Sequence, residues 1–397
     1  MNLLIQNATI VDERGARSGG VLIRDGRIAP AESGAEGCRV IDAEGLTLMP
    51  AFIDMHSHFR DPGFPAKETV ETGSRAAAAG GYTAVNTMAN TFPVCSSMET
   101  VEYVRRKAEE VGLVEVHQCV SVTENFDGRT TEHLRRLDGT VKLISEDGKG
   151  VQSNHVMAQA MRIAREKGLV VLSHAEDMEI SPYDYRLAEN IATARDIFLS
   201  EYTGARLHMC HVSTKEAMAD IIAAKKLGAP VTCEVAPHHL WFYGAGYRVN
   251  PPIREKEDVD FLIKAIREGW VDMIATDHAP HTEEDKKKGA PGMVGLETAF
   301  SVCFTRLVKS GEITLADLSR MLSRNPAKML GLRKGLIEPG YDGDVVLVDT
   351  ARAVVVDPAK LHGKSRNTPF AGERLFGQVC LTVHRGAVTY ERESENE

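Results

Sequence analysis

The chain has 397 residues, of which 43% are hydrophobic and 26% are charged, a composition that argues against extensive disorder. Its net charge of −9 and its lack of a basic block argue against nucleic acid or an anionic membrane as the main partner. We expect neither a signal peptide nor a membrane span, because no stretch is both long and apolar enough. The seven scattered cysteines are more typical of a reducing cytoplasm than of a disulfide framework, so we expect a cytoplasmic location.

Short strands are predicted at both ends of the chain. Near the start, residues 3–5 and 9–11 flank a predicted turn, and residues 21–23 pair with 27–28 across Asp25-Gly26 as a hairpin. Near the end, strands are predicted at 344–348, 354–356 and 379–383. Because either end alone has too little core, we expect residues 1–50 and 338–397 to form one small β-sandwich domain.

The middle of the chain, residues 51–337, alternates apolar runs with helical patterns. Helices are predicted at 157–167, 188–202 and 215–227, among others. Strands are predicted at 51–54, 82–87, 114–120, 141–144, 170–173, 206–210, 231–235 and 272–276. Eight strands close a (β/α)₈ TIM barrel, whereas a doubly wound open sheet lacks the support of a GxGxxG motif. The long loops 237–254 and 278–296 follow the last two strands and are expected to be functional.

Polar side chains gather where these strands end, and in a barrel such ends share one mouth. His56 and His58 follow the first strand, and their alternate spacing places both imidazoles on one side of an extended chain. His174, His211 and Asp277 end the fifth, sixth and eighth strands. Four imidazoles and a carboxylate exceed the needs of a single tetrahedral Zn²⁺. They fit two cations about 3.5–4 Å apart, bridged by a water or hydroxide.

Such a pair of cations needs an anionic bridging ligand from the end of the fourth strand. Asp147 serves without modification, although a loop carboxylate could equally be a solvated surface charge. Lys142 would have to be carboxylated by CO₂ before it could bind a metal. We favour Asp147 and keep carboxylated Lys142 as the alternative.

Several ordered motifs resemble those of the class I dihydroorotases, a cyclic-amidohydrolase group of the amidohydrolase superfamily. The resemblance runs essentially from end to end. The motifs are DMHSHFRDPG (54–63), NTMANT (86–91), SEDG (145–148), HVST (211–214), PHH (237–239), NPPIR (250–254), TDHAPH (276–281) and KSRNTPF (364–370).

The resemblance implies a role for each matching residue. His56 and His58 would bind one Zn²⁺ or similar divalent cation and His174 and His211 a second, with Asp147 as the bridge. Asp277 would be both a ligand and the catalytic base. The residues implied at the substrate are His58, then Arg60, Asn90 and His281 at its carboxylate, and Asn250, Gly292 and Met293 at its ring.

The implied reaction is the reversible cyclisation of N-carbamoyl-L-aspartate to L-dihydroorotate in pyrimidine biosynthesis. A hydroxide bridging the metals would attack the cyclic amide in the hydrolytic direction. Rival functions are a dihydropyrimidinase (hydantoinase), an allantoinase, or an inactive scaffold for aspartate transcarbamoylase. The neutral rings lack the carboxylate that Arg60 suits, and a dead scaffold would have lost metal ligands. We expect a homodimer and keep a transcarbamoylase as a candidate partner.

Overall fold

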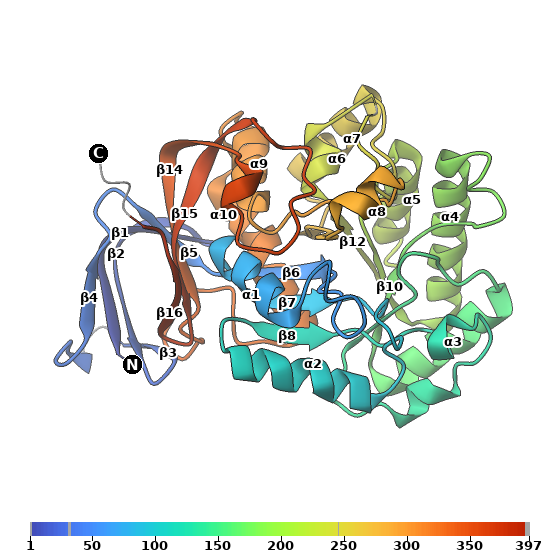
Figure 1. The fold of residues 1–397 in the computed structure, drawn as a ribbon, viewed down its shortest axis with the longest axis horizontal. Helices are drawn as coiled ribbons and strands as arrows, with labels where there is room; N and C mark the ends of the chain where they lie inside the picture. The colour runs from blue at the N-terminus through green and yellow to red at the C-terminus, as the bar shows by residue number, and fades with distance from the viewer. Residues whose placement is uncertain (1, 31–32, 245, 394–397) are drawn as a thin grey trace.

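Eight short parallel strands form the centre of the larger part of the molecule (Figure 1). The computed structural model describes residues 2–30, 33–244 and 246–393. The barrel strands are β6 (Phe52–Ser57), β7 (Tyr82–Thr87), β8 (Glu115–Gln118), β9 (Leu143–Ser145), β10 (Val170–Ser173), β11 (Arg206–Met209), β12 (Val231–Val235) and β13 (Met273–Ile274). Most of their residues are buried, as expected for strands that are covered on both faces.

The strands close into a ring. β6, β7 and β8 form one hydrogen-bonded run, and β9 to β13 form a second. Isolated parallel bridges join the two runs at both seams, between Val120 and Ile144 and between Ser57 and His278. The amide of His58 also donates to the carbonyl of His278 over 2.8 Å. This closure confirms the predicted (β/α)₈ barrel.

Helices surround the barrel and connect its strands. The α-helices are α1 (Val70–Ala79), α2 (Met98–Val111), α3 (Asn154–Lys167), α4 (Tyr185–Thr203), α5 (Lys215–Lys226), α6 (Pro237–Trp241), α7 (Lys256–Arg267), α8 (Glu283–Lys287), α9 (Ala299–Cys303), α10 (Leu315–Ser319) and α11 (Asn325–Leu330). Shorter helical turns are η2 (Glu124–Phe126), η3 (Glu132–Arg136), η4 (Phe304–Val308), η5 (Arg320–Arg324) and η6 (Pro358–Lys360). Among the described residues, no helix combines the length and the apolar character that a membrane crossing requires.

The crossover helices begin and end at local sequence signals. The side chains of Ser153, Asp184 and Thr214 accept hydrogen bonds from first-turn amides of α3, α4 and α5. α3 and α4 end at Gly168 and Gly204, whose φ values of 70° and 69° are left-handed and suit glycine. These caps define the length of each crossover and thereby where the next strand begins.

Strands from both ends of the chain form the second part of the molecule, on the left in Figure 1. They are β1 (Leu3–Asp12), β2 (Gly15–Arg24), β3 (Arg27–Ala29), β4 (Arg39–Asp42), β5 (Thr47–Pro50), β14 (Val345–Val355), β15 (Arg374–His384) and β16 (Ala387–Glu391). β5 pairs antiparallel with β14, with Met49 opposite Val346, and so joins the amino and carboxyl ends. Leu3, Ile23, Leu48 and Val383 share one apolar core with neighbours from both ends. The structure confirms the shared β unit, while its boundaries at residues 50 and 338 stay a prediction.

Some predicted details of these strands are wrong. The predicted turn between residues 5 and 9 is a β-bulge inside β1, where Asn7 adopts a φ of 60° and the strand continues. Asparagine tolerates this left-handed conformation, so the polar residues need not end the strand. The predicted strands 344–348 and 354–356 are likewise one strand, β14, with a register shift between Asp349 and Ala353. The two long loops contain the short helices α6 and α8.

Candidate active site and metal centre

The carboxyl ends of the barrel strands bring six predicted metal ligands together. All six are buried, and they lie at or beyond the carboxyl ends of five barrel strands. They are His56 and His58 on and after β6, Asp147 after β9, His174 after β10, His211 after β11, and Asp277 after β13. Residues far apart in the sequence therefore form one cluster, as expected for the mouth of a barrel.

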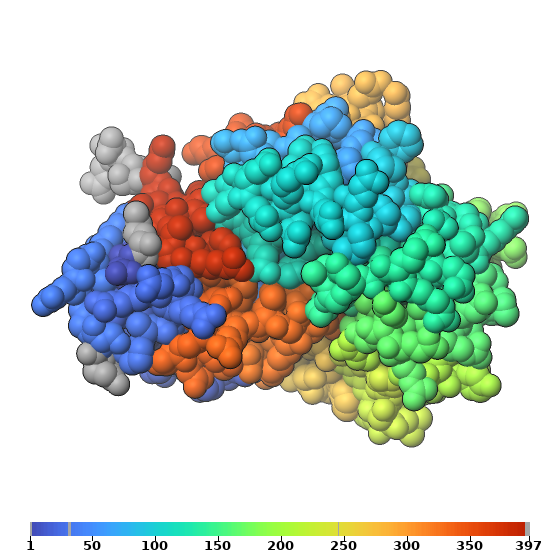
Figure 2. Space-filling view, turned by 90° about the horizontal axis from the view of Figure 1, so that it is seen from below, coloured from blue at the N-terminus to red at the C-terminus, as the bar shows by residue number. Residues whose placement is uncertain are grey.

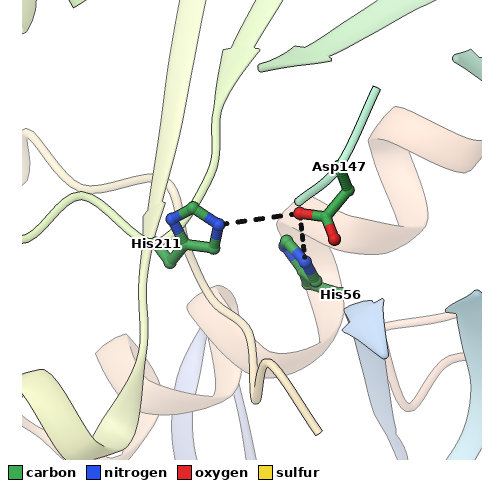
Figure 3. A group of neighbouring side chains, drawn as sticks. All are labelled: His56, Asp147 and His211. Atoms are coloured by element: carbon green, nitrogen blue, oxygen red, sulfur yellow. Dashed lines mark ion pairs between the residues drawn. The ribbon is translucent and has the colours of Figure 1, made fainter. Parts of the chain in front are cut away.

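The carboxylate of Asp147 lies at the centre of the four histidines. Its Oδ1 is 3.2 Å from His56 Nε2, 3.4 Å from His174 Nδ1 and 3.7 Å from His211 Nε2. Its Oδ2 is 3.5 Å from His58 Nε2. Figure 3 shows the carboxylate facing the rings of both His56 and His211. Burial alone would raise the pKa of Asp147, but His56, His174 and His211 hold it well below its usual range.

Lys142 lies outside this cluster. It precedes β9, its side chain is exposed, and its carbonyl accepts a hydrogen bond from the amide of Val170. Asp147 follows the same strand at the opposite end, which is the end that faces the histidines. The geometry therefore favours Asp147 over carboxylated Lys142 as the shared ligand.

Asp277 also faces the Nε2 atoms of His56 and His58. Its Oδ1 is 3.3 Å from His58 Nε2 and 3.6 Å from His56 Nε2. Its φ of 48° is strained for a non-glycine residue, and such strain is common at functional sites. Buried Asp54 holds the preceding turn in place by accepting from Thr276 N at 2.8 Å and Thr276 Oγ1 at 2.7 Å. Burial raises the pKa of Asp54 to about 7 despite these hydrogen bonds.

The hydrogen bonds around the histidines fit a metal centre. His56 Nδ1 donates to Glu234 Oε1 at 2.9 Å, and His58 Nδ1 donates to Asn90 Oδ1 at 2.9 Å, so both Nε2 lone pairs face the cluster. In the described part of the chain, His56 Nε2 is buried without a hydrogen-bond partner. A buried ring nitrogen directed at carboxylates, with its other nitrogen held by a carboxylate, is the arrangement of a metal ligand.

A third histidine shows the same arrangement. His174 Nε2 donates to Glu176 Oε2 at 2.9 Å, and its Nδ1 lies 3.0 Å from His211 Nε2. Two nitrogens at this distance, beside the carboxylate of Asp147, suit a shared cation. Without metal, burial lowers the pKa of His174, but Asp147 and Glu176 raise it to about 9. A divalent cation would replace this proton.

Glu234 and Glu176 hold two of the clustered histidines by hydrogen bonds, and the sequence analysis missed both. Glu234 also accepts from His208 Nε2 at 3.0 Å, so it joins His56 to a histidine outside the metal cluster. A glutamate inside the otherwise apolar run of β12 was a signal that could have revealed it. Glu176 lies only two residues after His174 and could have been examined on that ground.

Arg60 and His281 lie together beside the cluster. Arg60 Nη2 is 3.5 Å from His281 Nε2, and Arg60 Nε donates to the carbonyl of Pro280 at 3.4 Å. Burial lowers the pKa of Arg60 to about 10, so the guanidinium keeps its charge near neutral pH. Burial and the charges of Arg60 and Lys67 lower the pKa of His281 to about 3, so its ring is neutral. The pair offers a fixed positive charge and a neutral imidazole to an anionic group.

The other predicted substrate residues border the same mouth. Asn90 Nδ2 donates to Asp147 Oδ2 at 3.2 Å, and Asn250 Nδ2 donates to Glu176 Oε2 at 2.9 Å. Gly292 has a φ of +128°, and a Cβ there would lie 2.7 Å from the Cβ of Ala279, so a larger residue does not fit. The side chain of Met293 packs in an apolar cluster, which leaves only its main chain for a ligand.

Comparison with known proteins agrees with this site. Residues 47–387 match the Amidohydrolase family, so the chain belongs to this family of hydrolases, which is metal-dependent. The chain is 51% identical over 398 residues to a dihydroorotase of Clostridium botulinum (strain Eklund 17B / Type B), with 99% of this chain and 100% of the relative covered. It is 38% identical over 429 residues to a dihydroorotase of Thermoanaerobacter sp. (strain X514), with 100% and 99% covered. Within the family the chain groups with the dihydroorotases, as its motifs predicted.

Several solved structures with the same fold are hydantoinases. The L-hydantoinase (dihydropyrimidinase) from Arthrobacter aurescens superposes with a TM-score of 0.90 at 25% identity, covering 99% of this chain and 96% of that one. A D-hydantoinase (dihydropyrimidinase) from Thermus sp. superposes with a TM-score of 0.88 at 26% identity, covering 98% and 95%. These likenesses support the barrel and the β unit, and they are weaker in sequence than those to the dihydroorotases.

Proposed function

We propose that the chain catalyses the reversible ring closure of N-carbamoyl-L-aspartate to L-dihydroorotate. The observation that carries this proposal is the Arg60–His281 pair, 3.5 Å apart beside the metal cluster. L-Dihydroorotate has a ring carboxylate that a guanidinium binds with two parallel hydrogen bonds, whereas the neutral rings of dihydropyrimidinase and allantoinase substrates have none. The relatives named dihydroorotase support the same assignment.

We further propose that the cluster holds two Zn²⁺ ions or similar divalent cations. His56, His58 and Asp277 would hold one, His174 and His211 the other, and Asp147 would contact both. The four imidazoles and two carboxylates within one buried site support this donor set. When bound, such cations make a water molecule more acidic and polarise the amide carbonyl.

The remaining chemistry falls to side chains of the chain. Burial would raise the pKa of Asp277, but His58, His56 and His211 hold it below its usual range, so Asp277 rests as a carboxylate. In hydrolysis, Asp277 would take a proton from the attacking water and transfer it to the leaving ring nitrogen. In the biosynthetic direction, it would remove the proton from the attacking carbamoyl nitrogen, and water would leave.

Other residues would orient the substrate. Arg60 and His281 would bind its carboxylate together with the amide of Asn90, while His58 would border the carboxylate from the metal side. Asn250 and the main chain at Gly292 and Met293 would contact the ring. The hydrogen bonds that already fix these groups support this role, since pre-ordered partners lose little entropy on binding.

Three further features are proposed for the whole chain. We propose that residues 1–50 and 338–397 form the β domain and residues 51–337 the catalytic barrel, in line with the shared sheet. We propose a cytoplasmic homodimer, and all seven cysteines are free thiols, as a reducing compartment requires. Aspartate transcarbamoylase is kept as a candidate partner. An inactive scaffold is the weaker alternative, because every ligand position is filled.

The test is an assay of the purified chain with dihydroorotate, dihydrouracil, hydantoin and allantoin, together with metal analysis of the same sample. We expect dihydroorotate to be hydrolysed with the highest kcat/KM. A preference for any of the neutral rings would assign the chain to the hydantoinase-like alternative. A metal-loaded sample inactive on all four would favour the scaffold.

A further inference from the structure

Helix α4 exposes an unusual set of side chains for a helix on the outside of a barrel. It lies at the end of the molecule farthest from the β unit (Figure 1), on the green side of the surface in Figure 2. One of its exposed residues, Glu201, is charged, and the others are apolar or tyrosine: Tyr185, Leu187, Ile191, Ala194, Phe198 and Tyr202. Large apolar side chains exposed together usually mark a binding surface.

Helix α2 provides the comparison within the same chain. It also lies on the outside of the barrel, and its exposed residues are all charged: Glu99, Glu102, Arg105, Arg106, Glu109 and Glu110. This is the expected surface of a solvated helix. The composition of α4 therefore does not follow from its place in the barrel.

Five of the exposed α4 residues form a continuous line, which we call the α4 stripe: Leu187, Ile191, Ala194, Phe198 and Tyr202. Their spacings of four, three, four and four residues keep them within about 80° of arc on a helix that turns about 100° per residue. This spacing is typical of the seam between two packed helices. Phe198 is 65% exposed and Tyr202 is 72% exposed, so their own chain leaves most of these two side chains uncovered.

We propose that the α4 stripe is the interface of a homodimer in which two α4 helices pack antiparallel about a two-fold axis near Ala194. The order of the stripe supports a second copy as the occupant, because its one small residue, Ala194, lies in the middle and two large side chains flank it on each side. Antiparallel pairing places Leu187 opposite the partner's Tyr202 and Ile191 opposite the partner's Phe198. The small Ala194 then meets its own copy at the crossing point, where the helices approach most closely.

The available area agrees with a dimer. Tyr183, which is 90% exposed, and Met178, which is 40% exposed, lie in the segment before α4. The amide of Asp177 donates to the carbonyl of Ala188, so this segment borders the Leu187 end of the stripe. With roughly 200 Å² for a fully exposed large side chain, Tyr183, Met178 and the large stripe residues offer about 700 Å² per copy. A standard interface buries about 800 Å² per partner. Because each chain carries a net charge of −9, burial of this apolar surface has to outweigh the repulsion between the two copies.

The buried side of α4 supports the strand ends of the metal cluster. Its Glu189 accepts from Ser213 N at 2.8 Å and pairs with Arg254 at 2.8 Å, and its Asp196 accepts from Ser173 Oγ at 2.6 Å. Ser173 directly precedes His174. A dimer formed through the outer side of α4 would therefore hold rigid the half of the site that carries His174 and His211.

The first test is sedimentation velocity of the full chain, up to about 50 µM. We expect a species of twice the 43.4 kDa chain mass. Phe198→Glu should raise the dimer dissociation constant about 1,000-fold, because the buried aromatic occurs twice in a symmetric interface. Val355→Glu, at an apolar residue of β14 that is 60% exposed, is the matched control and should leave the dimer intact. A monomeric wild type, which would leave the stripe to a different protein, or a Phe198→Glu dimer as tight as wild type, would overturn the proposal.

The second test probes the arrangement of the two helices. Ala194→Cys should form an interchain disulfide under mild oxidation, because only a residue at the two-fold axis approaches its own copy closely enough. Ala223→Cys, at an exposed alanine on α5, should stay unlinked. A dimer that forms without any Ala194→Cys cross-link would overturn the antiparallel arrangement. The outcome does not depend on the proposed reaction, so failure of either proposal is recognised separately.

Discussion

The side chain of Asn367 holds the main chain of His281, a residue 86 positions earlier in the sequence. Asn367 Oδ1 accepts a hydrogen bond from the amide of His281 at 3.0 Å. Its Nδ2 donates to the carbonyls of Ala279 and Gly292 at 3.1 and 3.2 Å. One side chain from the carboxyl-terminal segment thus fixes the loop that carries three proposed substrate contacts, His281, Gly292 and Met293.

Asn367→Ala should raise KM for dihydroorotate about tenfold and change kcat much less. The loop would lose three hydrogen bonds, each of which contributes about 0.5–1.5 kcal/mol, while the metal cluster would stay intact. Steady-state kinetics and metal analysis check this result. Asn325→Ala is the control, because its Nδ2 donates to the Asp272 carbonyl at 2.8 Å, before β13 and away from the strand ends that carry the site. An unchanged KM in Asn367→Ala would show that the loop keeps its shape without this side chain.

Much of the cluster could be predicted because it depends on local pattern. Strand alternation places His56 and His58 on one side, and closure of the barrel brings the ends of β10, β11 and β13 to the same mouth. Asn367 could not be predicted in this way, because its partners lie in a loop that follows a different strand. The role of Glu234 could not be predicted either, because its partners His56 and His208 lie on other strands of the barrel.

The β unit shows the same limit: a feature set by neighbouring residues was predicted, and one set by pairing between strands was not. The hairpin at Asp25-Gly26 was predicted from its own residues, and the structure pairs Arg24 with Arg27 as expected. The turn predicted around Asn7 is wrong, because pairing with β2 on both sides of the bulge keeps β1 extended. Pairing between β1 and β2 therefore outweighed the turn preference of the polar residues around Asn7.

His174→Ala should lose one metal equivalent and nearly all turnover while the fold survives. The residue follows β10 at the barrel mouth, so its removal leaves the packing between strands and helices unchanged. Metal analysis and circular dichroism of the purified variant check both parts. A full metal complement in His174→Ala would contradict the assignment of this residue as a ligand.

Asp147→Ala and Lys142→Ala should behave in opposite ways. Because the carboxylate of Asp147 lies within 3.7 Å of three imidazoles through one oxygen, its loss should remove both metal and activity. The exposed Lys142 should be replaceable with little effect on either. Metal content and kcat of the two variants decide the point. The reverse pattern, with a mass increment on Lys142, would show that a carboxylated lysine is the bridge.

Glu146→Gln should change how stability depends on pH. Burial raises the pKa of Glu146 from 4.5 to about 7, although Thr123 N donates to it at 2.9 Å. Because the folded-state pKa is the higher one, the wild type loses free energy of unfolding as pH rises from about 4.5 to 7, by at most about 3 kcal/mol. Glutamine does not titrate. The stability of Glu146→Gln relative to wild type, from urea unfolding, should therefore increase over this pH window, and a constant difference would contradict the shift.

Arg60→Met should cost about 2–5 kcal/mol of transition-state binding with dihydroorotate, since the substrate carboxylate loses its charged partner. Metal content should not change, because Arg60 contacts Pro280 and His281 and none of the proposed ligands. Measured kcat/KM and metal content check this prediction. A variant with the kcat/KM of the wild type would show that Arg60 lies outside the substrate site.

The most direct test of the proposed function compares dihydroorotate with dihydrouracil, which differ by the ring carboxylate, in the wild type and in Arg60→Met. The ratio of the two kcat/KM values isolates recognition of that carboxylate, because the metal chemistry and the ring are shared. We predict that the wild type strongly prefers dihydroorotate and that Arg60→Met loses most of this preference. Equal kcat/KM values for the two substrates in the wild type, or a preference unchanged in Arg60→Met, would contradict the assignment.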